Sequence, residues 1–195
     1  MAEKNYDAKD IMVLEGLEAV RLRPGMYIGT TGSKGMHHLL WEIVDNAIDE
    51  IANGFGDTIT ITLNTDGSAT VEDNGRGIPV DEHPTLHKSG VEVVYTTLHA
   101  GGKFNTENYK FSGGLHGVGA SVTNALSKWC NVTVYKNKKE YFISFHSYMD
   151  EDGKMHSGVV KEPLRYVGKT TKSGTKVTFL PDSDMFGNIK FNFET

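Results

Sequence analysis

Apolar residues spaced three or four positions apart predict two helices in the first part of the chain. The first covers residues 10–21 and ends at Arg23-Pro24-Gly25, since proline cannot continue a helix. The second covers residues 35–53, where the apolar side chains fall on one face and a glycine follows as a stop. The same spacing predicts shorter helices over residues 91–98 and from Val118 onward.

Alternation of apolar and polar residues predicts strands in two parts of the chain. Residues 58–63 and 68–72 flank Asn64-Thr65-Asp66-Gly67, which is typical of a hairpin turn. Four further strands are predicted near the C-terminus, over residues 129–136, 140–147, 155–161 and 175–180. Helices early and strands late favour an α+β fold, a two-layer sandwich with helices on one face of a mixed, mainly antiparallel sheet.

Size and composition narrow the class of protein. The 195 residues suit one domain, which we expect to span residues 1–195. The formal net charge is -5, and no run of Lys and Arg resembles a nucleic-acid surface, so we expect any DNA contact to come mainly from a larger complex. The single cysteine, Cys130, fits a buried apolar role in a reducing cytoplasm. The sequence has no apolar run long enough to cross a membrane, and we expect no membrane association.

A glycine-dense stretch, Gly113 to Gly119, leads directly into the helix predicted from Val118. Glycines allow close backbone approach, and free N–H groups at a helix N-terminus bind phosphate. The stretch is not a P-loop, because Gly101-Gly102-Lys103 is followed by Phe104. The glycines also have the wrong order for a dinucleotide-binding turn. A flexible loop without a ligand is the alternative interpretation.

The second predicted helix carries an acidic and amide stripe beside its apolar face. Glu42 and Asn46 lie four residues apart, and so do Asp45 and Asp49, with Glu50 next to them. A carboxylate and an amide oxygen at this spacing could activate a water molecule and hold a hard cation. The alternative is an ordinary solvated helix face.

A third candidate, Asp73-Asn74-Gly75-Arg76-Gly77-Ile78-Pro79, directly follows a predicted strand. A carboxylate at a strand end can accept a hydrogen bond from an exocyclic amine such as adenine N6, although Asp-Asn-Gly is also common in plain turns. Lys103, in the long glycine-rich connection, could reach a terminal phosphate or could be a surface lysine.

The order of these elements resembles the GHKL ATPase superfamily with its Bergerat nucleotide-binding fold. The chain is most similar to the N-terminal ATPase domain of bacterial type II topoisomerase B subunits, the group that includes DNA gyrase and topoisomerase IV. The shared blocks cover nearly the whole chain: residues 14–21, 23–29, 41–50, 73–79, 98–104 and 112–119.

The resemblance implies an ATP site with magnesium. Glu42 would be the general base that polarises the attacking water, and Asn46 would bind Mg²⁺ together with the ATP phosphates. Asp73 would take the adenine amine, with a water shared by Gly77 and Thr175. The other implied ATP-binding residues are Tyr6, Glu50, Arg76 (paired with Glu50), Ile78, Pro79, Lys103, Tyr109, Gly114, Leu115, His116, Gly117, Val118 and Gly119.

The resemblance also implies partners. In the full protein we expect a heterotetramer with the topoisomerase A subunit, DNA bound by the whole complex, and an ATP-dependent homodimer that uses Tyr6 and Tyr27. We expect a fragment ending at Thr195 to be a monomer that binds ATP but hydrolyses and dimerises poorly. Aminocoumarins would compete with ATP, but weakly, because Lys136 stands where the family has an arginine.

Alternatives remain open at two levels. A non-hydrolysing nucleotide-binding or phosphotransfer module, such as a histidine-kinase catalytic domain, shares the fold but generally lacks the helix glutamate and the glycine lid. A mismatch-repair or chaperone ATPase of this fold would differ in the lid and in residues 23–27. The sequence does not separate gyrase from topoisomerase IV.

Overall fold

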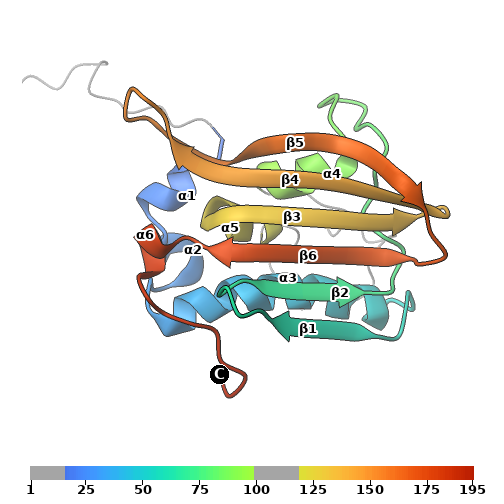
Figure 1. Cartoon of the computed structure of the whole chain (residues 1–195), viewed down its shortest axis with the longest axis horizontal. Helices are drawn as coiled ribbons and strands as arrows, with labels where there is room; N and C mark the ends of the chain where they lie inside the picture. The colour runs from blue at the N-terminus through green and yellow to red at the C-terminus, as the bar shows by residue number, and fades with distance from the viewer. Residues whose placement is uncertain (1–15, 99–118) are drawn as a thin grey trace, which may run out of the picture.

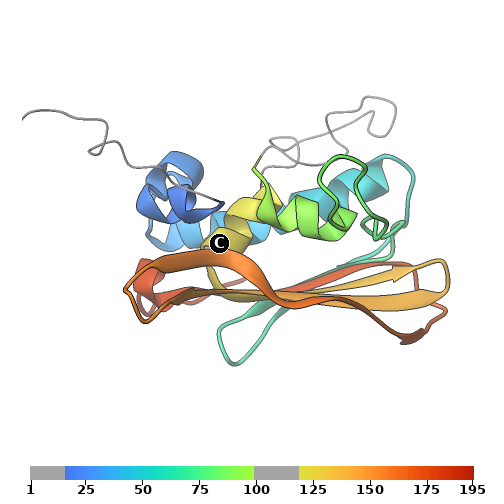
Figure 2. The ribbon, with the colours of Figure 1, turned by 90° about the horizontal axis from the view of Figure 1, so that it is seen from above.

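The computed structural model describes residues 16–98 and 119–195, which form two layers (Figures 1 and 2). One layer is a six-stranded sheet in the order β1-β2-β6-β3-β4-β5. Its strands are β1 (Ile59–Leu63), β2 (Ala69–Asp73), β3 (Ser127–Lys136), β4 (Lys139–Met149), β5 (Met155–Lys169) and β6 (Gly174–Pro181). Every neighbouring pair is antiparallel, so the described strands include no parallel pairing.

The other layer is made of helices, with one exception. They are α1 (Glu18–Leu22), α2 (Gly25–Ile28), α3 (Ser33–Ala52), α4 (Gly90–Thr96), α5 (Gly119–Ala125) and α6 (Ser183–Phe186). Figure 2 shows α1 to α5 over one face of the sheet, while α6 follows β6 at the sheet's end. The predicted two-layer α+β sandwich is therefore confirmed.

Within the described residues, the N-terminal helix begins later than predicted. Helix α1 begins only at Glu18, because Gly16 has a φ of +61° and cannot belong to a right-handed helix. The predicted residues before Gly16 lie outside the described part of the chain. Pro24 ends α1 as expected, and the short α2 then starts at Gly25.

The core lies between the layers, where apolar faces of helices and sheet meet. Val20, Leu39 and Ile43 from the helices pack with Val132 and Phe145 from the sheet. Cys130 is buried in the same cluster, as the sequence predicted. No helix within residues 16–98 or 119–195 is long and apolar enough to span a membrane.

Candidate functional site

Helix α3 presents Glu42, Asn46 and Glu50 along one stripe. Their four-residue spacing places them one turn apart, beside the buried positions Ile43 and Ala47. All three polar side chains are half-buried. The stripe therefore borders the core, as predicted, and is not an ordinary solvated face.

The Glu42 carboxylate lies against the first residue of α5. A Cβ atom built on Gly119 would overlap this carboxylate, so only glycine fits there without displacement. Glu42 Oε1 also lies 2.9 Å from His38 Nε2, one turn earlier on α3. The sequence analysis did not include His38 among the site residues, although its i,i+4 spacing from Glu42 predicts that the two side chains are neighbours on the helix.

A second group of residues gathers where β2 ends. Asp73 Oδ1 accepts a hydrogen bond from Gly75 N at 2.9 Å, and the Thr175 hydroxyl accepts one from Ile78 N at 3.1 Å. Burial raises the pKa of the Asp73 carboxyl, and the backbone N–H groups of Gly75 and Thr175 counteract that rise. Thr175 lies on β6, which pairs with β2, so the sheet brings these distant residues together.

Glycine is required at Gly174 because the backbone of β6 meets the turn there. A Cβ on Gly174 would overlap the carbonyl oxygen of Asp73, and its φ of +128° also favours glycine. Gly77, with a φ of +82°, is held near the carbonyls of Tyr135 and Gly174. The turn after β2 therefore lies directly on the ends of β3 and β6.

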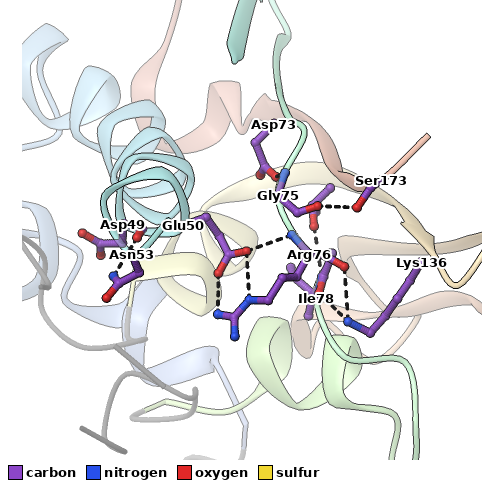
Figure 3. Close-up of polar contacts among 11 residues, drawn as sticks. Asp49, Glu50, Asn53, Asp73, Gly75, Arg76, Ile78, Lys136 and Ser173 are labelled. Atoms are coloured by element: carbon purple, nitrogen blue, oxygen red, sulfur yellow. Dashed lines mark hydrogen bonds and ion pairs between the residues drawn. The ribbon is translucent and has the colours of Figure 1, made fainter. Parts of the chain in front are cut away.

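Arg76 and Glu50 connect this turn to α3 (Figure 3). Glu50 Oε1 accepts from Arg76 Nη2 at 2.7 Å, and Glu50 Oε2 accepts from the Arg76 backbone N at 3.0 Å. The Arg76 guanidinium carbon lies 3.7 Å from the centroid of the Phe55 ring. The pairing that the resemblance implied is present, and the ring beneath it adds a cation–π contact.

The remaining predicted site residues divide into two groups. Ile78 is half-buried against the core and Pro79 is exposed, both on the turn after β2. The other residues lie outside the described part of the chain: Tyr6, Lys103, Tyr109, Gly114, Leu115, His116, Gly117 and Val118. The predicted glycine lid before Gly119 lies there too.

The donor chemistry beside α3 suits magnesium better than zinc. Within the described ranges no group of three His, Cys, Asp or Glu side chains could hold a metal ion. Glu42 and Asn46 supply hard oxygen donors, and Mg²⁺ is commonly held by one or two protein ligands together with substrate phosphates. These residues therefore fit Mg²⁺ only in company with a phosphate ligand.

Comparisons with known proteins identify the family to which this chain belongs. A family model described as histidine kinase-, DNA gyrase B-, and HSP90-like ATPase matches residues 31–184. The chain is 54% identical over 192 residues to the DNA gyrase B subunit of Spiroplasma citri, covering 98% of this chain and 29% of that protein. It is 54% identical over 196 residues to the DNA topoisomerase 4 B subunit of Staphylococcus aureus, covering 98% and 28%.

A solved structure shares the fold. The 43K ATPase domain of Thermus thermophilus gyrase B, in complex with an aminocoumarin, superposes with a TM-score of 0.77 at 49% identity. The match covers 91% of this chain and 42% of that one. The chain thus spans less than a third of the length of the two curated relatives.

Proposed function

Because the chain belongs to the histidine kinase-, DNA gyrase B-, and HSP90-like ATPase family, we propose that it is the ATP-binding and ATP-hydrolysing domain of a type II DNA topoisomerase. One observation carries the proposal. The Glu42–Asn46 stripe of α3 meets the N-terminus of α5, and the Arg76–Glu50 pair joins the same stripe to the Asp73 turn. One surface thus offers groups for a triphosphate at one end and for a base at the other.

At the phosphate end, Glu42 acts as general base toward the water that attacks the γ-phosphate. His38 Nε2, 2.9 Å from Glu42 Oε1, orients the carboxylate so that its other oxygen, Oε2, faces α5. Asn46 would hold Mg²⁺ together with the ATP phosphates, and a bound ion there would supply positive charge beside the phosphate groups. Lys103 and the N–H groups from Leu115 to Gly119 would complete phosphate binding. Gly114 and Tyr109 would lie in the same lid, and Tyr6 in the N-terminal arm would reach over the nucleotide of the partner protomer.

At the base end, the Asp73 carboxylate accepts the adenine N6 amine, with a water shared by Gly77 and Thr175. The Asp73 carboxylate already meets the N–H of Gly75, so its direction is fixed before a ligand arrives. Ile78 and Pro79 supply apolar contact with the base. The Arg76–Glu50 pair borders the site at its outer side.

The activity of the whole protein follows as part of the proposal. ATP-driven closure of a homodimer gate would be coupled to DNA double-strand passage, with a topoisomerase A subunit completing a cytoplasmic heterotetramer. DNA would bind mainly outside this domain, and aminocoumarins would compete with ATP. Gyrase and topoisomerase IV relatives match equally, at 54% identity, so the proposal covers both types of enzyme.

The deciding experiment separates binding from turnover. We expect Glu42→Ala to retain ATP affinity in calorimetry on this chain, and to abolish ATP hydrolysis in the full-length subunit. The matched control is Glu151→Ala, which removes an exposed carboxylate from the turn between β4 and β5. Bound ATP with no hydrolysis by the unaltered full-length protein would instead support the phosphotransfer alternative.

A further inference from the structure

The main chain of the turn after β2 is held by side chains from other elements. Lys136 Nζ donates to the carbonyl oxygens of Arg76 and Gly77, each at 3.2 Å. The Ser173 hydroxyl donates to the carbonyl of Gly75, and Thr175 Oγ1 accepts from Ile78 N. Figure 3 shows Lys136 and Ser173 approaching this turn from the sheet side, opposite Glu50.

Lys136 is well placed to fix one peptide orientation. It is the last residue of β3, it is half-buried, and its ammonium bridges two successive carbonyl groups. A charged donor makes a stronger hydrogen bond than a neutral one, and both acceptors here belong to a turn that lies beyond the end of β2. Gly77 has a φ of +82°, and because glycine can adopt more backbone angles than other residues, a contact from outside the turn helps to hold this peptide in one orientation.

We infer that Lys136 is a positioning residue for recognition of the nucleotide base, an inference that rests on the proposed function. Its ammonium holds the Arg76 and Gly77 carbonyls, and thereby sets Gly77 relative to Asp73 and Thr175. Lys136 donates to main chain and acts on the base only through that turn. Without the ammonium, the Arg76–Gly77 peptide rotates, and Gly77 no longer keeps its position relative to Asp73 and Thr175, which bind the adenine amine.

The test compares two nucleotides that differ at the exocyclic position. ATP carries an amine there and inosine triphosphate carries an oxygen, so only ATP gains from a correctly placed Asp73 carboxylate. We expect Lys136→Met to weaken ATP binding about tenfold, the loss typical of a charged hydrogen bond, while inosine triphosphate binding changes less than about twofold. Isothermal titration calorimetry on the 195-residue chain measures both affinities, and thermal unfolding measures stability.

Two further variants complete the design. Lys136→Arg keeps a cationic donor that can reach both carbonyls, so it should restore ATP affinity to within about twofold of the unaltered chain. Lys139→Met removes an exposed lysine just beyond the β3–β4 turn and should leave both affinities unchanged.

Two results with Lys136→Met would overturn this inference and leave the proposed function standing. One is an equal loss of affinity for ATP and inosine triphosphate, and the other is an unchanged affinity for ATP. Asp73→Asn distinguishes this from failure of the proposed function. If Asp73→Asn keeps the full preference for ATP over inosine triphosphate, or if the unaltered chain binds no ATP, the proposed site itself is wrong.

Discussion

At the residue scale, the site depends on close contacts that only particular side chains allow. Asp73, Gly77 and Thr175 could be found from the sequence because a motif marks each of them. Phe55 carries no such mark, His38 is marked only by its four-residue spacing from Glu42, and Lys136 is marked only by the resemblance. Lys136 and Phe55 act through contacts made only after folding, and a single lysine or phenylalanine has no spacing pattern that reports those contacts.

The contact between Gly119 and Glu42 gives the first prediction. Gly119→Ala places a methyl group on the carboxylate and on Glu42 Cβ, so either α5 or α3 must shift. We expect a loss of about 1–3 kcal/mol in the free energy of unfolding, the usual cost of overpacking, measured by urea denaturation. Gly168→Ala is the control, since nothing lies within 4 Å of its added Cβ. Equal effects of the two substitutions would contradict the contact.

The buried carboxyl of Asp73 gives a prediction about pH. Burial raises the pKa of this carboxyl above the ordinary aspartate value, so it takes up a proton at a higher pH than an exposed aspartate does. The protonated form is a poor acceptor for an amine, and ATP affinity should therefore fall on acidification, beginning above pH about 4. Calorimetric titrations across this range test the prediction. An acid-induced loss that persists in Asp73→Asn would assign the effect to another group.

At the element scale, β5 shows where the hydrophobic pattern stops being informative. The predicted strand ends at residue 161, yet β5 continues to Lys169. Pro163 interrupts the alternation of apolar and polar residues. The pairing of β5 with β4 also shifts register at four places. Pro163 and the bulges are tolerated because β5 is an edge strand. Regular elements such as α3, whose period is unbroken, were predicted to within a few residues.

Arg21 links three separate elements and gives a prediction about stability. It donates to the carbonyl of Ala125 in α5 at 2.7 Å and pairs with Asp182, before α6, at 2.6 Å. Both partners of the ion pair are nearly buried, at 6% and 9% side-chain exposure. Arg21→Met leaves the Asp182 charge buried without this partner, and we expect a loss of about 3–5 kcal/mol in urea denaturation.

The matched control is the exposed pair between Lys172 and Glu72, 3.4 Å apart. Lys172→Met should cost less than about 1 kcal/mol, because water already solvates both groups of an exposed pair. If the two substitutions destabilise the protein equally, burial is not what gives the Arg21 pair its importance.

At the scale of the whole molecule, the sequence predicted the layers but not the strand order. Local patterns place helices and strands along the chain, whereas the order of strands depends on contacts between distant segments. Nothing in residues 174–181 alone indicates that β6 enters between β2 and β3. That placement brings Thr175 to Asp73, so the geometry of the site is a property of the topology.

The last prediction concerns the chain as one unit. We expect the 195-residue chain to bind ATP, yet to hydrolyse it slowly and to remain a monomer with a non-hydrolysable ATP analogue. The relatives are more than three times as long, and under the proposed function the regions beyond this chain would supply gate closure and full turnover. Steady-state ATPase assays and light scattering test this expectation. A turnover rate equal to that of the full-length protein would refute it.

The position of β6 also determines when this sheet can be completed during synthesis. The β1–β2 hairpin and the β3–β4–β5 meander can each form from neighbouring segments, but only β6 joins them into one sheet. A nascent chain that contains β1 to β5 but not yet β6 therefore exposes the unpaired edges of β2 and β3 to the ribosome surface and to chaperones. The strand that closes the sheet also delivers Thr175, so nucleotide binding becomes possible only as folding is completed.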